Sequence, residues 1–192
     1  IKTWTKNHPN SIGCLGDICK IEPNEVAKLL EAKGVNKIDI ITGGVPCQGF
    51  SRANRKHIDH DDRNFLFLEY MKFVEFFQPS YILLENVSGM RSTAGGQFEE
   101  AIKSYMEELG YIVNVKLINA ADYGVPQIRN RLIFVGVHPT ISSIPYEFPI
   151  GPYVNNYNTV KDAISDLPIL ENNEEKIKYE SKAITNYQKL MR

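Results

Sequence analysis

Three short segments of this chain carry side chains suited to covalent chemistry on a substrate. Cys47 lies in a loop rich in glycine and proline that spans residues 43–51, and Glu85 follows a second apolar run. Arg129 and Arg131 stand at the start of a third apolar run. A thiolate is a strong nucleophile, and a carboxyl group can donate or accept a proton. Together these groups indicate nucleophilic catalysis assisted by a carboxyl group.

Cys47 is the sharpest candidate for a catalytic residue. The apolar run 38–42 before its loop predicts a buried strand, and catalytic groups of open α/β sheets collect where strands end. Pro46 fixes the backbone before the cysteine, and the glycines allow a substrate to approach closely. A free thiol has a pKa of ~8.5, so the site must lower this pKa to give a useful thiolate fraction. The alternative is an inert buried cysteine, which the flanking residues disfavour.

Glu85 and the two arginines are weaker candidates when each is taken alone. Glu85 ends the apolar run 81–84 at the same predicted sheet edge, where a carboxylate is costly to bury without a partner or a task. The alternative is a glutamate that caps a helix or forms an ion pair. Arg129 and Arg131 stand at the start of a strand, and we expect them to point to opposite faces. One is expected at the site and the other at a loop, unless both are ordinary surface arginines.

A charged stretch at residues 52–63 follows the cysteine loop. It has no apolar stripe, and we expect a mobile lid that closes over the substrate. His57, Asp59, His60 and Asp61 raise the alternative of a metal site. A solvated loop is favoured over that alternative, because no ligands elsewhere in the sequence complete the set. No metal is therefore predicted.

Strand-like and helix-like segments alternate along the chain, which predicts an α/β sheet. The sheet is expected to be mostly parallel, with its last two strands as an antiparallel pair at one edge. Asn24 and Gly34 are expected to bound the first helix, Asn64 to cap the second, and Thr159 to cap a short later one. The expected strands are 38–42, 81–84, 111–118 and 132–137, and the expected helices are 25–33, 64–76, 97–109 and 160–167.

Composition sets the outer limits on the class of protein. With 192 residues the chain can form one domain and a tail, and it contains no apolar run near the ~20 residues of a membrane helix. The three cysteines form no CxxC pair, which favours a reducing, cytoplasmic setting with Cys14 and Cys19 as small buried residues. The net charge of −1 gives no general nucleic-acid signal, so any such contact depends on local basic groups.

In their order and spacing, the three segments resemble the DNA cytosine-5 methyltransferase family. The resemblance implies a Rossmann-like class I fold that uses S-adenosylmethionine and acts on double-stranded DNA with a flipped cytosine. It implies that Cys47 adds covalently to C6 of the base, that Glu85 holds N3 and the exocyclic amine, and that Arg129 and Arg131 complete the catalytic set. The implied substrate-binding residues are Gln48, Ser51, Asn86, Val87 and Gln127, and the implied cofactor-binding residues are Asp17, Ile18, Pro46 and Leu66.

The same resemblance predicts how the chain is organised. Residues 1–150 are expected to be a catalytic domain without its first βα unit, and residues 151–192 a linker toward a target-recognition domain. The family's Phe-x-Gly-x-Gly loop and its acidic ribose ligand are missing. We therefore expect a chain truncated at both ends that, by itself, binds S-adenosylmethionine weakly and does not methylate DNA.

The biological setting and three rival functions complete the prediction. A bacterial restriction-modification enzyme is expected, with a cognate endonuclease that it does not contact directly. Methylation of RNA is one rival, and a methyltransferase-like fragment that binds nucleic acid without catalysis is another. A nicotinamide-dependent oxidoreductase is disfavoured, because no dinucleotide fingerprint occurs.

Overall fold

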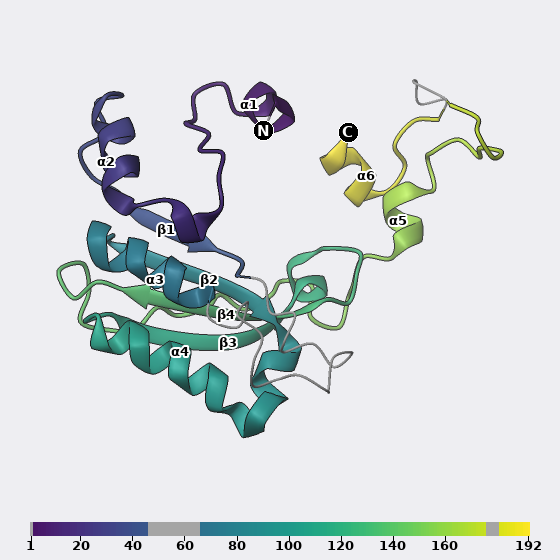
Figure 1. Cartoon of the computed structure of the whole chain (residues 1–192). Helices are drawn as coiled ribbons and strands as arrows, with labels where there is room; N and C mark the ends of the chain where they lie inside the picture. Colours follow the sequence, from purple (N-terminus) through teal and green to yellow (C-terminus); the bar gives the residue numbers. More distant parts are fainter. Residues whose placement is uncertain (1, 46–65, 176–180) are drawn as a thin grey trace. The chain divides into compact units, whose positions relative to one another are not determined.

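The structure is a computed structural model that describes residues 2–45, 66–175 and 181–192 (Figure 1). By its internal contacts the chain forms two compact units. The first unit consists of Ile1–Lys116 and Leu132–Glu147, and the second of Leu117–Arg131 and Phe148–Arg192. Each unit is described by itself below. In the described part of the chain, no helix is both long and apolar enough to cross a membrane.

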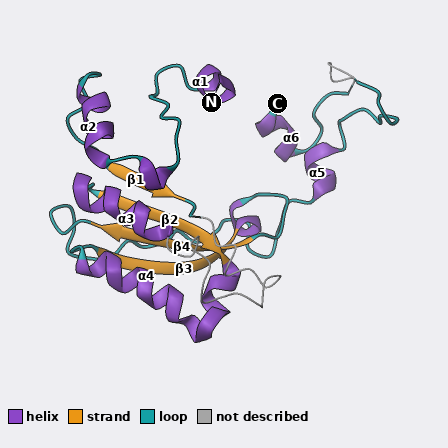
Figure 2. Cartoon of the chain, in the orientation of Figure 1, coloured by secondary structure: helices purple, strands orange, loops and turns teal. Residues whose placement is uncertain are grey.

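A four-stranded mixed sheet forms the centre of the first unit, with its strands in the order β1-β2-β4-β3 (Figure 2). β1 (Ile40–Gly43) pairs in parallel with β2 (Tyr81–Val87). β4 (Asn130–Val137) runs the opposite way to β2, since the amide of His138 after β4 donates to the carbonyl of Ser80 before β2 at 2.9 Å. β3 (Ile112–Asn119) is the edge strand beyond β4. The predicted α/β class and the pairing of the last two strands are confirmed, but β4 lies inside the sheet.

Two helices pack against the sheet and build the apolar core. α3 (Leu66–Phe77) connects β1 to β2, and α4 (Gln97–Glu108) precedes β3; Figure 1 shows both in front of the sheet. The Phe67 and Tyr105 rings meet edge to face, with centroids 6.3 Å apart, so both helices lie on the same side. The core consists of Tyr70, Met71, Val74, Ile82, Leu84, Met90, Ile102, Met106, Tyr111, Leu132 and Phe134.

Each of the two helices buries one face against the core. In α4, Ile102 and Met106 are buried, and Phe98, Tyr105 and Leu109 pack against the same core. In α3 the buried residues are Tyr70, Met71 and Val74. α3 is apolar nearly all round, so its sequence does not fix which way the helix is rotated.

The N-terminal region differs from the prediction in three ways. α1 (Lys2–Asn7) is a helix that was not predicted. α2 (Pro23–Glu31) begins two residues earlier than predicted, with Pro23 in the first turn instead of a capping Asn24. Proline suits that position because its missing N–H would have no partner within the helix. Cys14 and Cys19 are exposed rather than buried, and η1 (Ile18–Lys20) carries the second of them.

β1 was expected to be buried, but it is an edge strand of the sheet. The side chain of Ile40 is 56% exposed, and no described strand pairs with the far side of β1. η4 (Ser88–Gly96) follows β2 directly and was not predicted. Of the cysteine loop at residues 43–51, residues 43–45 are described.

The second unit consists of short helices and irregular chain. η5 (Ala120–Tyr123) follows β3, and α5 (Val160–Ile164) and α6 (Asn186–Met191) come later in the chain. Thr159 caps α5 as predicted, and it forms a capping box with Asp162. The division into a catalytic domain at 1–150 and a linker at 151–192 stays a prediction.

Candidate active site

The carboxyl ends of β1 and β2 bring Glu85 to the entrance of the cysteine loop. In the parallel register Gly43 lies opposite Leu84, so the next residues along, Gly44 and Glu85, are neighbours. A Cβ atom added to Gly44 would lie 3.3 Å from Oε2 of Glu85. The carboxyl group therefore touches the backbone three residues before Cys47. Cys47, Pro46, Gln48 and Ser51 lie outside the described residues, as does the expected lid at 52–63.

Glu85, Asn86 and Val87 are part of β2, which is three residues longer than predicted. Glu85 is half-buried and Asn86 is 2% exposed, as expected when successive side chains of a strand face opposite sides. The Oδ1 atom of Asn86 accepts a hydrogen bond from the Val87 amide at 2.8 Å. Its buried Nδ2 has no hydrogen-bond partner within the described residues. A shared site of Glu85 and Cys47 stays a prediction.

Tyr70 of α3 supports the same sheet edge from the helix side, and the sequence analysis missed it. Its hydroxyl lies within hydrogen-bond distance of the carbonyls of Ile41, at 3.0 Å, and Leu83, at 3.2 Å. Its ring fills the space over Gly43, where an added Cβ atom would lie only 2.6 Å from the ring. Burial raises the pKa of the Tyr70 phenol, which therefore stays protonated and able to donate. The sequence offered one sign of this role: a tyrosine in the apolar helix that comes directly before β2.

The arginine segment belongs to the second unit. Arg129 is exposed, its amide donates to Oδ1 of Asn119 at 3.1 Å, and its carbonyl accepts from the Ala120 amide at 2.9 Å. Arg131 is half-buried, and its Nη1 donates to the carbonyl of Asn130 at 2.8 Å. The prediction that the two side chains point to opposite faces is wrong, because side chains two residues apart in a strand lie on the same face, and Arg129 precedes β4. Gln127, two residues before Arg129, is exposed.

The described residues predicted to hold the cofactor lie on η1 and at the start of α3. Asp17 caps η1, with Oδ1 accepting from the Cys19 amide at 3.1 Å, and Ile18 is 43% exposed. Leu66 is the half-buried first residue of α3. An ion pair of 2.9 Å between Lys72 and Glu22 joins α3 to the chain that follows η1. An exposed carboxylate beside an exposed apolar side chain fits an adenine ring, which offers an amine and an apolar face.

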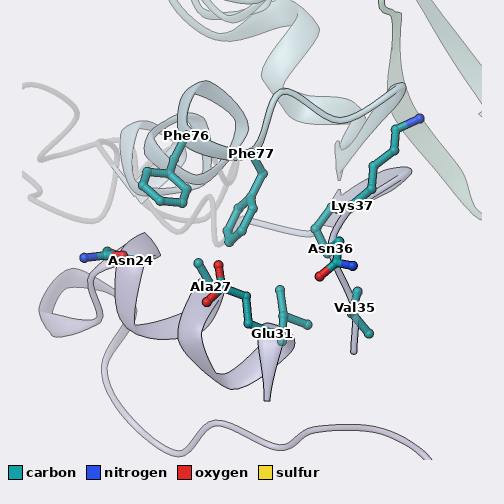
Figure 3. A pocket seen from close by; sticks show the side chains of 10 residues that line it. Asn24, Ala27, Glu31, Val35, Asn36, Lys37, Phe76 and Phe77 are labelled. Carbon is teal, nitrogen blue, oxygen red and sulfur yellow. The ribbon is translucent and has the colours of Figure 1, made fainter. Parts of the chain in front are cut away.

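A pocket of about 390 Å³ lies elsewhere in the first unit, between α2 and the end of α3. Figure 3 shows Phe76 and Phe77 facing α2, with residues 35–37 along one side. Those last residues precede β1, whereas Gly44 follows it, so the pocket lies at the opposite end of the strand from Glu85. It is lined by Asn24, Ala27, Leu30, Glu31, Val35, Asn36, Lys37, Ile38, Phe76 and Phe77. Within the described residues, no three His, Cys, Asp or Glu side chains gather as metal ligands would.

A family model of C-5 cytosine-specific DNA methylases matches residues 1–192, the whole chain. The chain belongs to this family. Type II methyltransferase M.AgeI of Thalassovita gelatinovora is 34% identical over all of this chain, which covers 50% of that protein. Type II methyltransferase M.BspRI of Lysinibacillus sphaericus is 36% identical over 88% of this chain and 38% of its own length. The chain thus spans about half or less of the curated relatives it matches.

Solved methyltransferase structures share the fold. A protein described as a DNA modification methyltransferase encoded within a prophage of E. coli superposes with a TM-score of 0.67. It is 28% identical, over 94% of this chain and 49% of the other. A methyltransferase of Entamoeba histolytica, 18% identical, superposes with a TM-score of 0.61 over 89% of this chain and 49% of its own. The predicted methyltransferase fold is confirmed.

Proposed function

We propose that this protein transfers a methyl group to C5 of cytosine in double-stranded DNA. The observation that carries the proposal is the Glu85 carboxyl group against Gly44, at the joint end of two parallel strands and three residues before Cys47. Membership of the C-5 cytosine-specific family supports the substrate and the reaction. Because the chain covers about half of its relatives, the proposal concerns the full-length protein.

The reaction begins with covalent addition. Cytosine C5 is a poor nucleophile, so the Cys47 thiolate first adds to C6, and the ring electrons then become available at C5. C6 cannot be reached in a stacked duplex, so the base is flipped out of the helix into the site. The loop of residues 46–51 supplies Gln48 and Ser51 as further contacts to the substrate.

Glu85 stabilises the charge that develops on the ring. In its protonated form it donates to N3, and it also contacts the exocyclic amine, so its interaction strengthens as electrons move into the ring. Val87, on the same face of β2 as Glu85, lines the same side of the base, and Asn86 supports Glu85 from the opposite face of the strand. Arg129 and Arg131 hold the O2 side of the base and the cysteine loop, with Gln127 beside them.

S-adenosylmethionine, when bound, supplies the methyl group. The Asp17 carboxylate would accept a hydrogen bond from the adenine amine, and Ile18, Leu66 and Pro46 would hold the cofactor's apolar surface. After methylation, C5 loses its proton, the Cys47 sulfur leaves C6, and the aromatic ring is restored. No described side chain is an evident base for the C5 proton, and water takes this role in the proposal.

The biological setting follows from the relatives, which are named Type II methyltransferases. We propose a cytoplasmic bacterial restriction-modification enzyme whose cognate endonuclease acts on the same DNA without contacting this chain. RNA methylation and binding without catalysis are the competing functions. DNA and transfer-RNA substrates compared side by side separate the first of these from the proposal.

The deciding experiment traps the covalent intermediate. When the target base of duplex DNA is 5-fluorocytosine, C5 carries a fluorine in place of the proton that must leave. The fluorine cannot leave, so the full-length protein should remain covalently joined to the DNA. Mass spectrometry detects this adduct. Cys47→Ser should form no adduct, while Cys14→Ser, which alters an exposed cysteine, should form it at the wild-type rate. An adduct that persists in Cys47→Ser would refute the assigned nucleophile, and no adduct with the wild-type protein would refute the function.

A further inference from the structure

The loop that leads to the arginines is closed at its base by one asparagine. Oδ1 of Asn119 accepts hydrogen bonds from the amides of Ala121, at 3.2 Å, and Arg129, at 3.1 Å. The Ala120 amide donates to the Arg129 carbonyl at 2.9 Å. Both backbone polar groups of Arg129 are therefore fixed by the first residues of the loop. A change in the shape of this loop would move Arg129 and the residues that follow it.

Residues 149–158 of the same unit form hydrogen bonds with this loop. The Tyr157 hydroxyl donates to Oδ1 of Asp122 at 2.8 Å, and the Tyr153 amide donates to the Asp122 carbonyl at 3.0 Å. Nδ2 of Asn158 donates to the Gly124 carbonyl at 2.8 Å. We call this set of contacts between residues 122–124 and 149–158 the clasp; it also includes a 2.8 Å hydrogen bond from the Tyr123 hydroxyl to the Pro149 carbonyl.

Two glycines permit the close approach that the clasp requires. Gly124 has a φ of 95°, and a Cβ atom there would lie 2.9 Å from the Tyr153 ring. A Cβ atom on Gly151 would lie 2.5 Å from the Asp122 carbonyl oxygen. Larger residues fit at neither place without movement of the backbone or of the Tyr153 ring. The contact therefore depends on residue types on both sides of it.

Electrostatics support the central hydrogen bond. The hydrogen bond to Asp122 raises the pKa of the Tyr157 phenol, and a weaker opposing contribution comes from the Asn119 side chain. The Tyr157 hydroxyl thus remains a proton donor at neutral pH. It connects the segment after residue 149 to the Asp122 carboxylate on the loop. Because Asn119 fixes the Arg129 amide at the base of the same loop, the clasp holds the loop that leads to Arg129.

We propose that Asp122 and Tyr157 are positioning residues that hold the Gln127–Arg131 segment in the geometry required for methyl transfer. The inference rests on the proposed function, in which Arg129 and Arg131 hold the base and the cysteine loop. Neither Asp122 nor Tyr157 touches the substrate in this scheme. Their effect passes through Asn119 and the backbone of Arg129.

Single-turnover methylation of duplex DNA by the full-length protein tests the inference, because it separates two effects. The amplitude counts correctly folded active sites, whereas the rate constant reports how well each site is arranged. Tyr157→Phe should lower the rate constant about tenfold, the scale of one lost hydrogen bond to a charged group, with the amplitude kept. Asp122→Asn, which retains an oxygen acceptor for the hydroxyl, should keep most of the rate. Asp122→Ala should resemble Tyr157→Phe.

A double variant and a matched control complete the design. Asp122→Ala combined with Tyr157→Phe should be no slower than either single variant if both act through one contact. Tyr187→Phe removes a hydroxyl that has no hydrogen bond to the described residues of the same unit, and should leave the rate unchanged. An unchanged rate constant in Tyr157→Phe, or a loss confined to the amplitude, would overturn the positioning role. Wild-type protein without activity would instead refute the proposed function.

Discussion

At the scale of single residues, Gly43 and Gly44 stand side by side but face different neighbours. An alanine methyl at 43 would enter the Tyr70 ring, which is 5% exposed and bonded to two strands, whereas at 44 it would meet the end of the Glu85 side chain. A buried ring cannot yield cheaply, but a half-buried carboxyl group can turn away.

Gly43→Ala should therefore cost about 2 kcal/mol of the free energy of unfolding, the typical scale of overpacking. Gly44→Ala should cost little stability yet slow methylation, because it moves Glu85. Denaturant titration and a methylation assay on both variants provide the measurement. Equal losses of stability in the two variants would show that the Tyr70 ring is not the rigid neighbour assumed here.

Glu85→Gln tests the role of the carboxyl group with almost no change of shape. The rate of methyl transfer should fall by a factor on the order of 100 to 1,000, as for other groups that stabilise charge in a transition state. DNA affinity should change little, because the interaction strengthens only as the reaction proceeds.

A filter-binding titration and a single-turnover assay separate these two effects. Glu107→Gln is the matched control, since Glu107 forms only an exposed pair with Lys103 at 3.6 Å. A Glu85→Gln protein that methylates at the wild-type rate would remove Glu85 from the mechanism.

The sequence predicts Glu85 better than Tyr70 for a physical reason. Two apolar runs that each end in polar residues suggest parallel strands with a common edge, and the register of Gly43 with Leu84 bears this out. The position of Tyr70 depends on the rotation of α3, which its nearly uniform apolar composition leaves open. Cys14 and Cys19 were expected to be buried because cysteines generally are, but both are exposed. Residue type alone does not say whether the surrounding chain packs against the core.

At the scale of elements, local signals predicted helices better than they predicted the sheet. Thr159 three residues before Asp162 predicts the start of α5, because a capping box needs only local contacts. The insertion of β4 between β2 and β3 depends on which surfaces remain uncovered after the chain has folded. No single segment encodes such a strand order. The pairing of β3 with β4 was therefore predicted correctly, but the position of β4 inside the sheet was not.

The α5 capping box gives a prediction about pH. Hydrogen bonds from the Thr159 hydroxyl and amide lower the pKa of the Asp162 carboxyl group. A lowered pKa in the folded state means that the contribution to stability is present above the ordinary aspartate pKa and is lost as the pH falls through the lowered one.

Thr159→Ala should cost about 1 kcal/mol near neutral pH, as the loss of a helix cap typically does. In strongly acidic solution the difference from wild type should shrink, since Asp162 is then protonated in both proteins. Hydrogen exchange of the α5 amides against pH measures this difference. A cost that stays constant down to acidic pH would contradict the role of the ionised carboxylate.

At the scale of the whole chain, the two units are stabilised by different interactions. The apolar core cluster lies entirely in the first unit, on β2, β4, α3, α4 and the residues next to them. In the second unit the buried side chains include Asp166 and Gln188, and Arg192 forms two hydrogen bonds of 3.1 Å with Asp166. Apolar burial makes a cooperative core, whereas a polar network on short helices can open locally.

Hydrogen exchange should therefore be slowest in β2 and β4 and much faster in α5 and α6. Gln188 is fully buried, with Nε2 donating to Ser165 Oγ at 2.9 Å and Oε1 accepting from the Ile184 amide at 2.8 Å. Gln188→Ala removes these hydrogen bonds together with the buried side chain that makes them, so exchange should accelerate across residues 159–192 and stay unchanged in β2. Tyr187→Phe, one position earlier on α6, is the control and should alter neither region. Faster exchange throughout both units in Gln188→Ala would mean that the chain unfolds as one cooperative body, and that the polar network contributes to the stability of the sheet as well.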